Sequence, residues 1–234
     1  MVWARVVDRL TDERAAVVVF DMLFSEAENV KSDGLLERAL RKNGRVIIPL
    51  DFDFSETGYK ESGFTDKQVD FLLPSAYAVL KNTDSPYSPL EAKMVLPPLE
   101  QFSTAAASVA PINMIPDSDG TLRWELLAIK YQDDYYAPIG LQAARLYRTL
   151  ELPSLTLDGQ GSVQLAGTVI PTDAHSRMLI NYRGPDGTFP RYSISDIVDG
   201  KTPAGAFQDK IVLIGATAIG IYDLRVTPFS SNMA

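Results

Sequence analysis

Apolar and polar positions near the start of the chain follow two different periods. Val2, Val6 and Leu10 recur at helical spacing and predict a helix over 2–14. The run AAVVVFD at 15–21 is continuous and rich in β-branched residues. Such a run is typical of a strand that is covered on both faces in a parallel sheet. A helix followed by a buried strand is therefore expected at the start of the fold.

A second helix and a second strand follow. Asp33 and Gly44 flank LLERALRKN, and they predict the N-cap and the stop of a helix. RVIIPL at 45–50 predicts another buried strand, so strand, helix and strand form one βαβ unit, expected to be right-handed. Near the other end of the chain, FQDKIVLIGATA at 207–218 predicts a last buried strand that ends in a glycine turn.

The middle of the chain is less regular. Residues 51–98 are rich in turn residues and prolines, and they predict a long excursion of short strands over one edge of the sheet. Around the turn PDSDG, SVAPINMI and TLRWELLAIKY predict a hairpin. Further elements are expected as a short helix at 99–106, a helix at 137–152, short hairpins over 155–182, and a helix capped by Ser193 with Asp196 as its acidic third residue.

These patterns predict an α/β fold as a single domain over 1–234. We expect a mainly parallel central sheet flanked by helices, with an irregular β-rich insertion and hairpins. No apolar run approaches the ~20 residues that cross a bilayer. Any membrane anchor is therefore expected outside this sequence.

Composition narrows the classes of function. The net charge is −8, which argues against a nucleic-acid partner, because phosphate binding needs a basic face. Cysteine is absent, which excludes disulfides, thiolate metal sites and cysteine nucleophiles. No cofactor motif is present, and we predict neither a cofactor nor a metal.

Three motifs that suggest catalysis or nucleotide binding fail at the residue level. The glycines at 215 and 220 are followed by Ile221 and Tyr222 instead of the P-loop Lys-Ser/Thr, and GKT at 200–202 has Ser195 where the first P-loop glycine belongs. His175 is the single histidine, lies in a turn and is expected to be exposed. No GxSxG elbow accompanies it, so a Ser-His-Asp triad is not predicted.

PDSDG at 116–120 suggests the start of a calcium loop. Counted from Asp117, however, its glycine falls at position four and Ala128 at position twelve, whereas an EF-hand needs glycine at six and glutamate at twelve. We favour an Asp-Gly turn here and leave a one-off cation site open.

The carboxyl ends of the predicted parallel strands carry the best candidate site. Asp21 ends the first strand, and Gly215, Thr217 and Asp223 follow the last one. If the two strands are neighbours, these residues meet at one edge, where open α/β sheets bind ligands. A polar ligand pocket is one interpretation. A buried hydrogen-bond network that caps the sheet is slightly favoured over it.

Several segments in order resemble the type-two CHASE domain, the second class of cyclases and histidine kinases associated sensory extracellular domains. FDMLFSE at 20–26 and DGLLERAL resemble its early part, DSDGTLRWELL its D-x-DG-x-x-R hairpin, and F-x-DKIVLIGATA-x-G-x-x-D-x-x-x-TPF its most characteristic segment. Arg123 and Thr227 lie in these motifs. With Asp21, Gly215, Thr217 and Asp223, they complete the candidate ligand-binding or coupling residues.

The resemblance implies the input domain of a bacterial membrane signalling protein, on the periplasmic face of the inner membrane. It implies flanking transmembrane segments outside this sequence and an output that is a nucleotide cyclase, diguanylate cyclase or kinase. Members also carry one further strand before MVWARVV, so the domain is expected to be trimmed. The family has no agreed ligand, so the partner is expected to be an unidentified small molecule, and a homodimer is also considered.

Two other classes of function stay open. One is a hydrolase-like α/β enzyme that uses carboxylates, although no pair of carboxylates is singled out by its spacing. The other is a dimerisation scaffold without a ligand, for which the aromatic and proline-rich middle supplies a candidate interface. We expect this chain itself not to be an enzyme.

Overall fold

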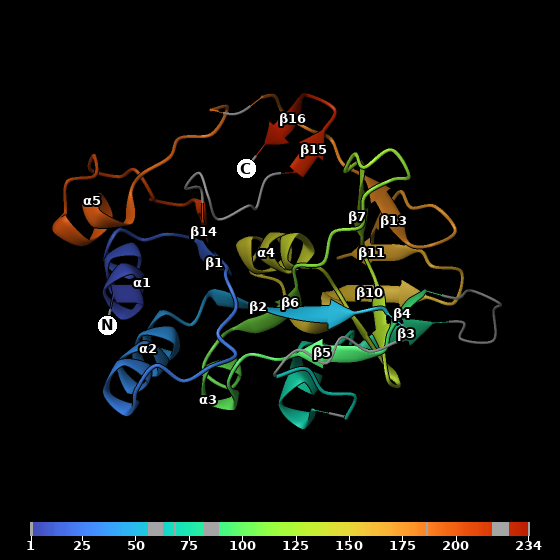
Figure 1. Cartoon of the computed structure of the whole chain (residues 1–234), viewed down its shortest axis with the longest axis horizontal. Coiled ribbons are helices and arrows are strands. Elements are labelled where there is room, and N and C mark those ends of the chain that lie inside the picture. Colours follow the sequence, from blue (N-terminus) through green and yellow to red (C-terminus); the bar gives the residue numbers. More distant parts are fainter. Residues whose placement is uncertain are drawn as a thin grey trace.

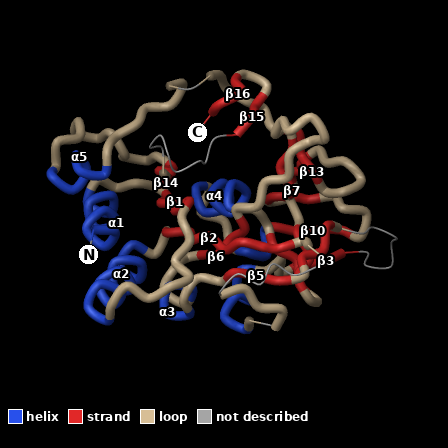
Figure 2. The backbone as a smooth tube through the Cα atoms, viewed as in Figure 1, coloured by secondary structure: helices blue, strands red, loops and turns tan. Residues whose placement is uncertain are grey.

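The computed structural model describes residues 2–55, 63–67, 69–81, 89–185, 187–216 and 225–233. The α-helices of this part of the chain are α1 (Val2–Asp12), α2 (Val30–Asn43), α3 (Glu100–Ser103), α4 (Ile139–Tyr147) and α5 (Ile194–Asp199). Two 3₁₀ helices, η1 (Asp70–Ser75) and η2 (Leu152–Ser154), accompany them. Figure 2 shows α1, α2 and α5 grouped at one end of the molecule, with small sheets at the other.

The largest sheet is mixed. Its order is β14 (Ile211–Gly215), β1 (Val17–Asp21), β2 (Val46–Asp53), with both β5 (Met94–Leu96) and β6 (Ser108–Pro111) paired to β2. β1 pairs in parallel with β14 and β2, and β2 pairs in parallel with β6 but antiparallel with β5. The predicted α/β class is confirmed. The predicted mainly parallel central sheet is not, because the sheets are mixed or antiparallel.

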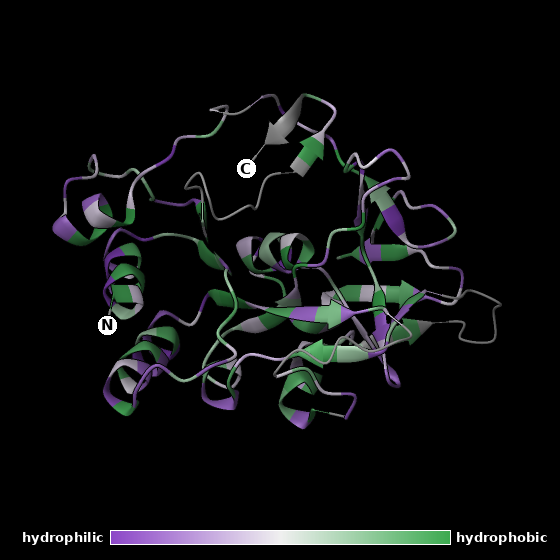
Figure 3. Ribbon diagram, viewed as in Figure 1, coloured by the Kyte–Doolittle hydropathy of each residue, from purple (hydrophilic) through white to green (hydrophobic). Residues whose placement is uncertain are grey.

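Apolar side chains cover both faces of this sheet. On one face, Val17 and Val19 pack with Ala143 of α4. On the other, Val18 and Phe20 belong to the main core, which also holds residues of α1 and α2. α4 lies across the middle of the sheet in Figure 1, and α1 and α2 show both colours of Figure 3, as amphipathic helices do. The continuous apolar run of β1 therefore reflects burial on two sides, as predicted.

The helix boundaries follow local capping chemistry. Gly44 ends α2 in the left-handed region at φ 67°, as predicted, where a residue without Cβ is favoured. The predicted N-cap, Asp33, is wrong. Asn29 caps α2 instead, because its side chain accepts a hydrogen bond from the Ser32 backbone N–H at 2.9 Å, so the helix begins one turn earlier. The predicted cap of α5 is confirmed, since Ser193 accepts from the Asp196 N–H at 3.1 Å.

The strand-rich end is built from small sheets. β10 (Leu155–Asp158), β11 (Val163–Leu165) and β12 (Thr168–Ile170) form an antiparallel meander, and β3 (Val79–Lys81) joins β10 in parallel. A second sheet has the order β4 (Leu90–Ala92), β8 (Ile129–Tyr131), β9 (Asp134–Tyr136), and two ribbons pair β7 (Trp124–Leu126) with β13 (Arg177–Leu179) and β15 (Arg225–Thr227) with β16 (Ser230–Met233).

The predicted hairpin around PDSDG is wrong. The segment before the turn is β6, which pairs with β2, and the segment after it is β7, which pairs with β13. The turn itself exists, because the Gly120 N–H donates to the Asp117 carbonyl at 2.8 Å and Gly120 has φ 80°. The sequence therefore predicts the turn correctly, but the strand partners of its flanking segments lie far away in the sequence.

The last strand of the main sheet is not buried as predicted. β14 lies at the edge, and Ile211 and Leu213 face the α4 side, where Leu213 is 72% exposed. Ile214 faces the main core and is 3% exposed. Helix α4 covers β1, β2 and β6 and leaves this side of β14 open to solvent. Among the described residues, no helix combines the length and the apolar character that a membrane crossing requires.

Candidate functional site

The carboxyl end of β1 meets the end of β14, as the sequence predicts. Asp21 and Gly215 are register partners, and a Cβ on Gly215 would lie 3.5 Å from the Asp21 carboxylate. On one side of β1 the sheet continues with β2, and on the other side it continues with β14, the last strand in the sequence to join it. Such a reversal of strand order creates a crevice where α/β sheets bind ligands. Asp21 is exposed at this point.

The other candidate residues do not all join this pair. Thr217 and Asp223 lie outside the described residues. Thr227 belongs to β15, and Arg123 precedes β7. The structure therefore brings together Asp21 with Gly215, and it places Arg123 and Thr227 in a second region.

Arg123 and the PDSDG turn form a compact ion cluster. The guanidinium donates to Asp117 at 2.8 Å and to both oxygens of Asp119, at 3.0 and 2.8 Å. The pKa of Asp119 is held well below its usual range, first by the Arg123 hydrogen bonds and then by the Thr121 N–H. Arg123 supplies the positive charge that a cation would bring, so the turn is an arginine-bound Asp-Gly turn.

The second region joins two segments that are distant in sequence. Residues 121–122 run beside β15, since Thr121 bridges Val226 and the Leu122 N–H donates to the Val226 carbonyl at 2.8 Å. The Phe229 ring lies 6.3 Å from the ring of Tyr182, whose hydroxyl donates to the Leu122 carbonyl at 3.0 Å. The stretch around Thr227 is thus attached to residues 121–122, which lie between Asp119 and Arg123 of the ion cluster.

Next to the ion cluster lies a carboxylate whose pKa is raised and not lowered. Glu125 on β7 pairs in register with Met178 of β13, and burial raises its pKa to about 7. Tyr182 is affected in turn, because burial and then the Glu125 charge raise the pKa of its hydroxyl. Glu125 was not among the predicted site residues, since nothing in WELL distinguishes it from an exposed strand residue.

Two motifs that the sequence set aside have ordinary structural roles. Gly200 ends α5 in the left-handed region at φ 68°, and Lys201 pairs with Asp199 at 2.9 Å, so GKT is a loop after a helix. His175 is exposed in its turn, as predicted. Within the described ranges, histidines and carboxylates do not gather in any group of three that could hold a metal ion.

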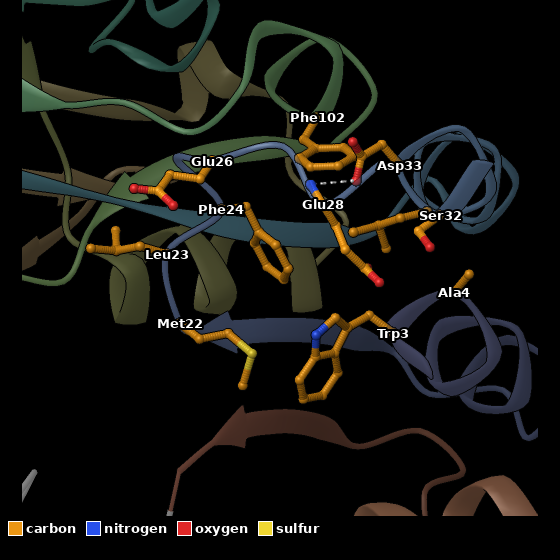
Figure 4. Close-up of a pocket in the computed structure, with 11 residues that line it drawn as sticks. Trp3, Ala4, Met22, Leu23, Phe24, Glu26, Glu28, Ser32, Asp33 and Phe102 are labelled. Atoms are coloured by element: carbon orange, nitrogen blue, oxygen red, sulfur yellow. Dashed lines mark hydrogen bonds between the residues drawn. The ribbon is translucent and has the colours of Figure 1, made fainter. Parts of the chain in front are cut away.

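A pocket beside Asp21 is lined by residues that the sequence analysis did not predict as site residues. Its volume is about 190 Å³, and the chain that follows Asp21 lines one side of it. Figure 4 shows rings and carboxylates gathered there from several elements. The segment FDMLFSEAENV is rich in aromatic and acidic residues, which is a signal that the sequence offers. Trp3 and Phe102 come close to this segment only in the folded structure. The lining residues are Trp3, Ala4, Met22, Leu23, Phe24, Glu26, Glu28, Ser32, Asp33, Leu36 and Phe102.

Comparison with known families decides the identity of the fold. The model of a family described as CHASE2 domain matches residues 1–234, which is the whole chain. The chain belongs to the CHASE2 domain family. CHASE2 domains are sensory extracellular domains of signalling proteins, so this chain is a sensory domain and not a catalytic one. A comparison with curated proteins and with solved structures gives no significant match to it.

The motifs of the family can be located in the structure. The segments that carried the resemblance in the sequence correspond to β1 and its following chain, to the ion cluster, and to β14 with β15. In this CHASE2 domain, the first and last of them meet at Asp21 and Gly215, while the ion cluster lies beside β15. A sensory domain needs a place that receives a stimulus and a segment that passes it on, and these two regions are the candidates.

Proposed function

We propose that this CHASE2 domain is the extracytoplasmic input domain of a bacterial transmembrane signalling protein. It faces the periplasm, and the output of its parent protein is a nucleotide cyclase, a diguanylate cyclase or a kinase. The observation that carries the proposal is the family match over 1–234. Extracellular sensing without a catalytic constellation in the described residues is consistent with it.

The stimulus acts at the carboxyl end of β1, and residues 225–233 pass it on. A ligand that binds one of two arrangements more tightly shifts the population toward that arrangement. The attachment of β15 to residues 121–122 supports a role for this segment, because hydrogen bonds and a ring contact connect it to the body of the domain. A change that alters this attachment alters the position of residues 225–233.

The absence of cysteine allows a direct test of the proposed location. Asp12→Cys would introduce the only thiol of the domain at an exposed position at the end of α1. In the parent protein, a membrane-impermeant maleimide is expected to label this thiol in cells with a permeable outer membrane and an intact inner membrane. A cysteine in the output domain serves as the internal control. Labelling of Asp12→Cys only after lysis of the inner membrane would contradict the proposal.

The proposed coupling has a matched pair of variants. Phe229→Ala removes the ring contact with Tyr182, whereas Phe189→Ala removes a phenylalanine that is 69% exposed. The output activity of the parent protein in membranes is expected to change with Phe229→Ala and to stay at the parental level with Phe189→Ala. Equal output from both variants would count against a coupling role for residues 225–233.

A further inference from the structure

Strand β14 forms one edge of the main sheet. It pairs with β1 on one side, and within the described part of the chain no strand pairs with its other side. Figure 1 shows β14 next to β1, on the side away from β2. An edge strand presents N–H and C=O groups without ladder partners, and these groups can pair with a strand of another chain.

Alternate residues of β14 direct their backbone groups to opposite sides of the strand. The Val17 N–H, at the start of β1, donates to the Lys210 carbonyl at 3.3 Å, so Lys210 and every second residue after it face β1. The backbone groups of the residues between them face away from β1. The outward N–H and C=O groups are therefore those of Ile211, Leu213 and Gly215.

This edge lacks the features that usually prevent association. Natural edge strands are protected by charged residues, prolines, bulges or a covering element. The strand IVLIG contains neither a charge nor a proline, and its register with β1 continues without a bulge over residues 211–215. On the α4 side, Leu213 is 72% exposed and Ile211 is 39% exposed. The edge thus combines outward backbone groups with exposed aliphatic side chains.

A second copy of β14 complements this edge. A two-fold axis through Leu213, perpendicular to the sheet, places two β14 strands antiparallel and sets Leu213 opposite Leu213 and Ile211 opposite Gly215. Each outward N–H of one copy then faces an outward C=O of the other. Because this axis keeps the α4 sides of both sheets on one face, the exposed Leu213 and Ile211 side chains of the two copies come together there.

Helix α4 leaves room for this pairing. Its residue Ala143 packs on Val17 and Val19 of β1, and Arg45 at the start of β2 donates to the carbonyl of Leu146 near the end of the helix. The helix is thus held over the inner strands and does not cover Leu213. A parallel arrangement of the two β14 strands would turn the α4 sides to opposite faces and separate the two leucines, so the antiparallel arrangement is favoured.

We propose that β14 is a self-association surface, at which the β14 strands of two copies pair antiparallel and join the two main sheets into one. The partner is a second copy of this chain, because one edge supplies both the donors and the acceptors, and its uncharged side chains meet one another across the axis. The inference goes beyond the proposed function and does not depend on it, since the contact involves only residues 211–215.

Sedimentation velocity of the chain in solution measures the association. A strand of five residues gives a contact at the small end of interface sizes, so we expect a dimer with a Kd on the order of 0.1 mM. Each copy carries a net charge of −8, and added salt should strengthen the dimer because it screens the repulsion between copies. A chain that stays monomeric at about 1 mM would overturn the inference.

Two variants with the same change of charge locate the surface. Leu213→Lys places a charge at the centre of the edge, whereas Val169→Lys changes a residue that is 57% exposed on β12, an edge strand of another sheet. Leu213→Lys is expected to weaken the dimer at least about tenfold, and Val169→Lys less than about twofold. Both variants reduce the net negative charge equally, so a difference between them cannot come from overall repulsion. Equal effects would overturn the inference.

The absence of cysteine allows the register to be tested as well. Leu213→Cys would place two thiols opposite each other on the two-fold axis, with Cα atoms about 5.5 Å apart, which is within the range of a disulfide. Mild oxidation is expected to link Leu213→Cys at least about ten times faster than Val169→Cys, because only the former thiols face each other in the dimer. Equal rates would contradict the register.

The same oxidation in the parent protein, with any other cysteines replaced by serine, tests whether the edge is used there. Linkage of Leu213→Cys between two parent chains is the expected result. Linkage of the isolated domain but not of the parent protein would show that another strand of the parent covers β14, and it would overturn the inference. The labelling experiment with Asp12→Cys decides the location of the domain independently of either result.

Discussion

Acidic side chains have different surroundings at the carboxyl end of β1 and around β7. At the end of β1, carboxylates surround an aromatic cavity that has no basic lining residue. Around β7, Arg123 binds Asp117 and Asp119, while burial raises the pKa of the neighbouring Glu125 to about 7. Among the described lining residues of the first region there is no lysine, arginine or histidine, whereas the second region contains Arg123. The second region therefore neutralises two of its carboxylates with its own arginine, whereas the first groups acidic and aromatic side chains around a pocket.

The largest expected effect is on stability and concerns the edge-to-face ring contacts beside the pocket. These contacts join Trp3 to Phe20, Phe20 to Phe24, and Phe24 to Phe102. Phe20→Ala removes a fully buried ring that contacts both Trp3 and Phe24. Denaturant unfolding should show a loss of about 3–5 kcal/mol, because the cavity left in the core relaxes only in part. Leu213→Ala, at the exposed face of β14, is the control and should cost less than about 0.5 kcal/mol. A small loss for Phe20→Ala would mean that the ring chain is not a rigid support.

The next effect belongs to Glu125 in the second region. Its folded pKa is raised from 4.5 to about 7, so the protonated form is favoured on folding. The free energy of unfolding therefore has its full value with respect to Glu125 below pH 4.5, and it decreases as the pH rises through about 7. Glu125→Gln should therefore leave stability at pH 4 almost unchanged and increase it at pH 8 by up to about 3 kcal/mol.

Thermal and denaturant unfolding of both proteins across this pH range measure the difference. Glu91→Gln is a matched control on β4, with a carboxylate whose side chain is 49% exposed. It should follow the parental pH profile. Parallel profiles for Glu125→Gln and the parent would show that the carboxylate is solvated, and the contrast between the two regions would weaken.

A smaller effect concerns the helix that closes the cavity. Asn29→Ala removes the side-chain cap of α2, and a loss of about 1 kcal/mol is expected in denaturant unfolding. Lys31→Ala, an exposed residue of the same helix, should stay within about 0.5 kcal/mol. If Asp33→Asn cost more than Asn29→Ala, the buried carboxylate would contribute more to the start of α2 than its cap.

The smallest expected effect is on a single titration. Arg123→Gln should raise the pKa of Asp119 toward its ordinary 3.8, as followed by NMR of the carboxyl carbon. The Asp119 pKa is depressed in the folded state, so its contribution to stability is present above the ordinary pKa and is lost as the pH falls. Asp173, which pairs with Arg177 at 2.7 Å, should titrate as before in this variant. An unchanged Asp119 titration would show that Arg123 does not hold it.

Local patterns predicted the parts of the fold that depend on neighbours in the sequence. α1, β1, the stop at Gly44 and the cap at Ser193 follow from spacing, β-branched content and capping residues. The meeting of Asp21 with Gly215 also followed, because parallel strands place their carboxyl ends at one edge. The predicted hairpin at PDSDG is wrong because a turn constrains only its own residues, and β6 and β7 pair instead with β2 and β13, which are distant in sequence.

The sequence by itself determined the α/β character, the buried first strand, the acidic charge and the family. Each of these depends on local periodicity or on motifs that can be read in order. Tertiary structure alone decided that β14 is an exposed edge, that the Glu125 carboxylate is partly buried, and that Trp3 and Phe102 meet the acidic chain after β1. The physical reason is that burial, pKa and cavity shape are set by groups far apart in the chain, which meet only when the elements pack.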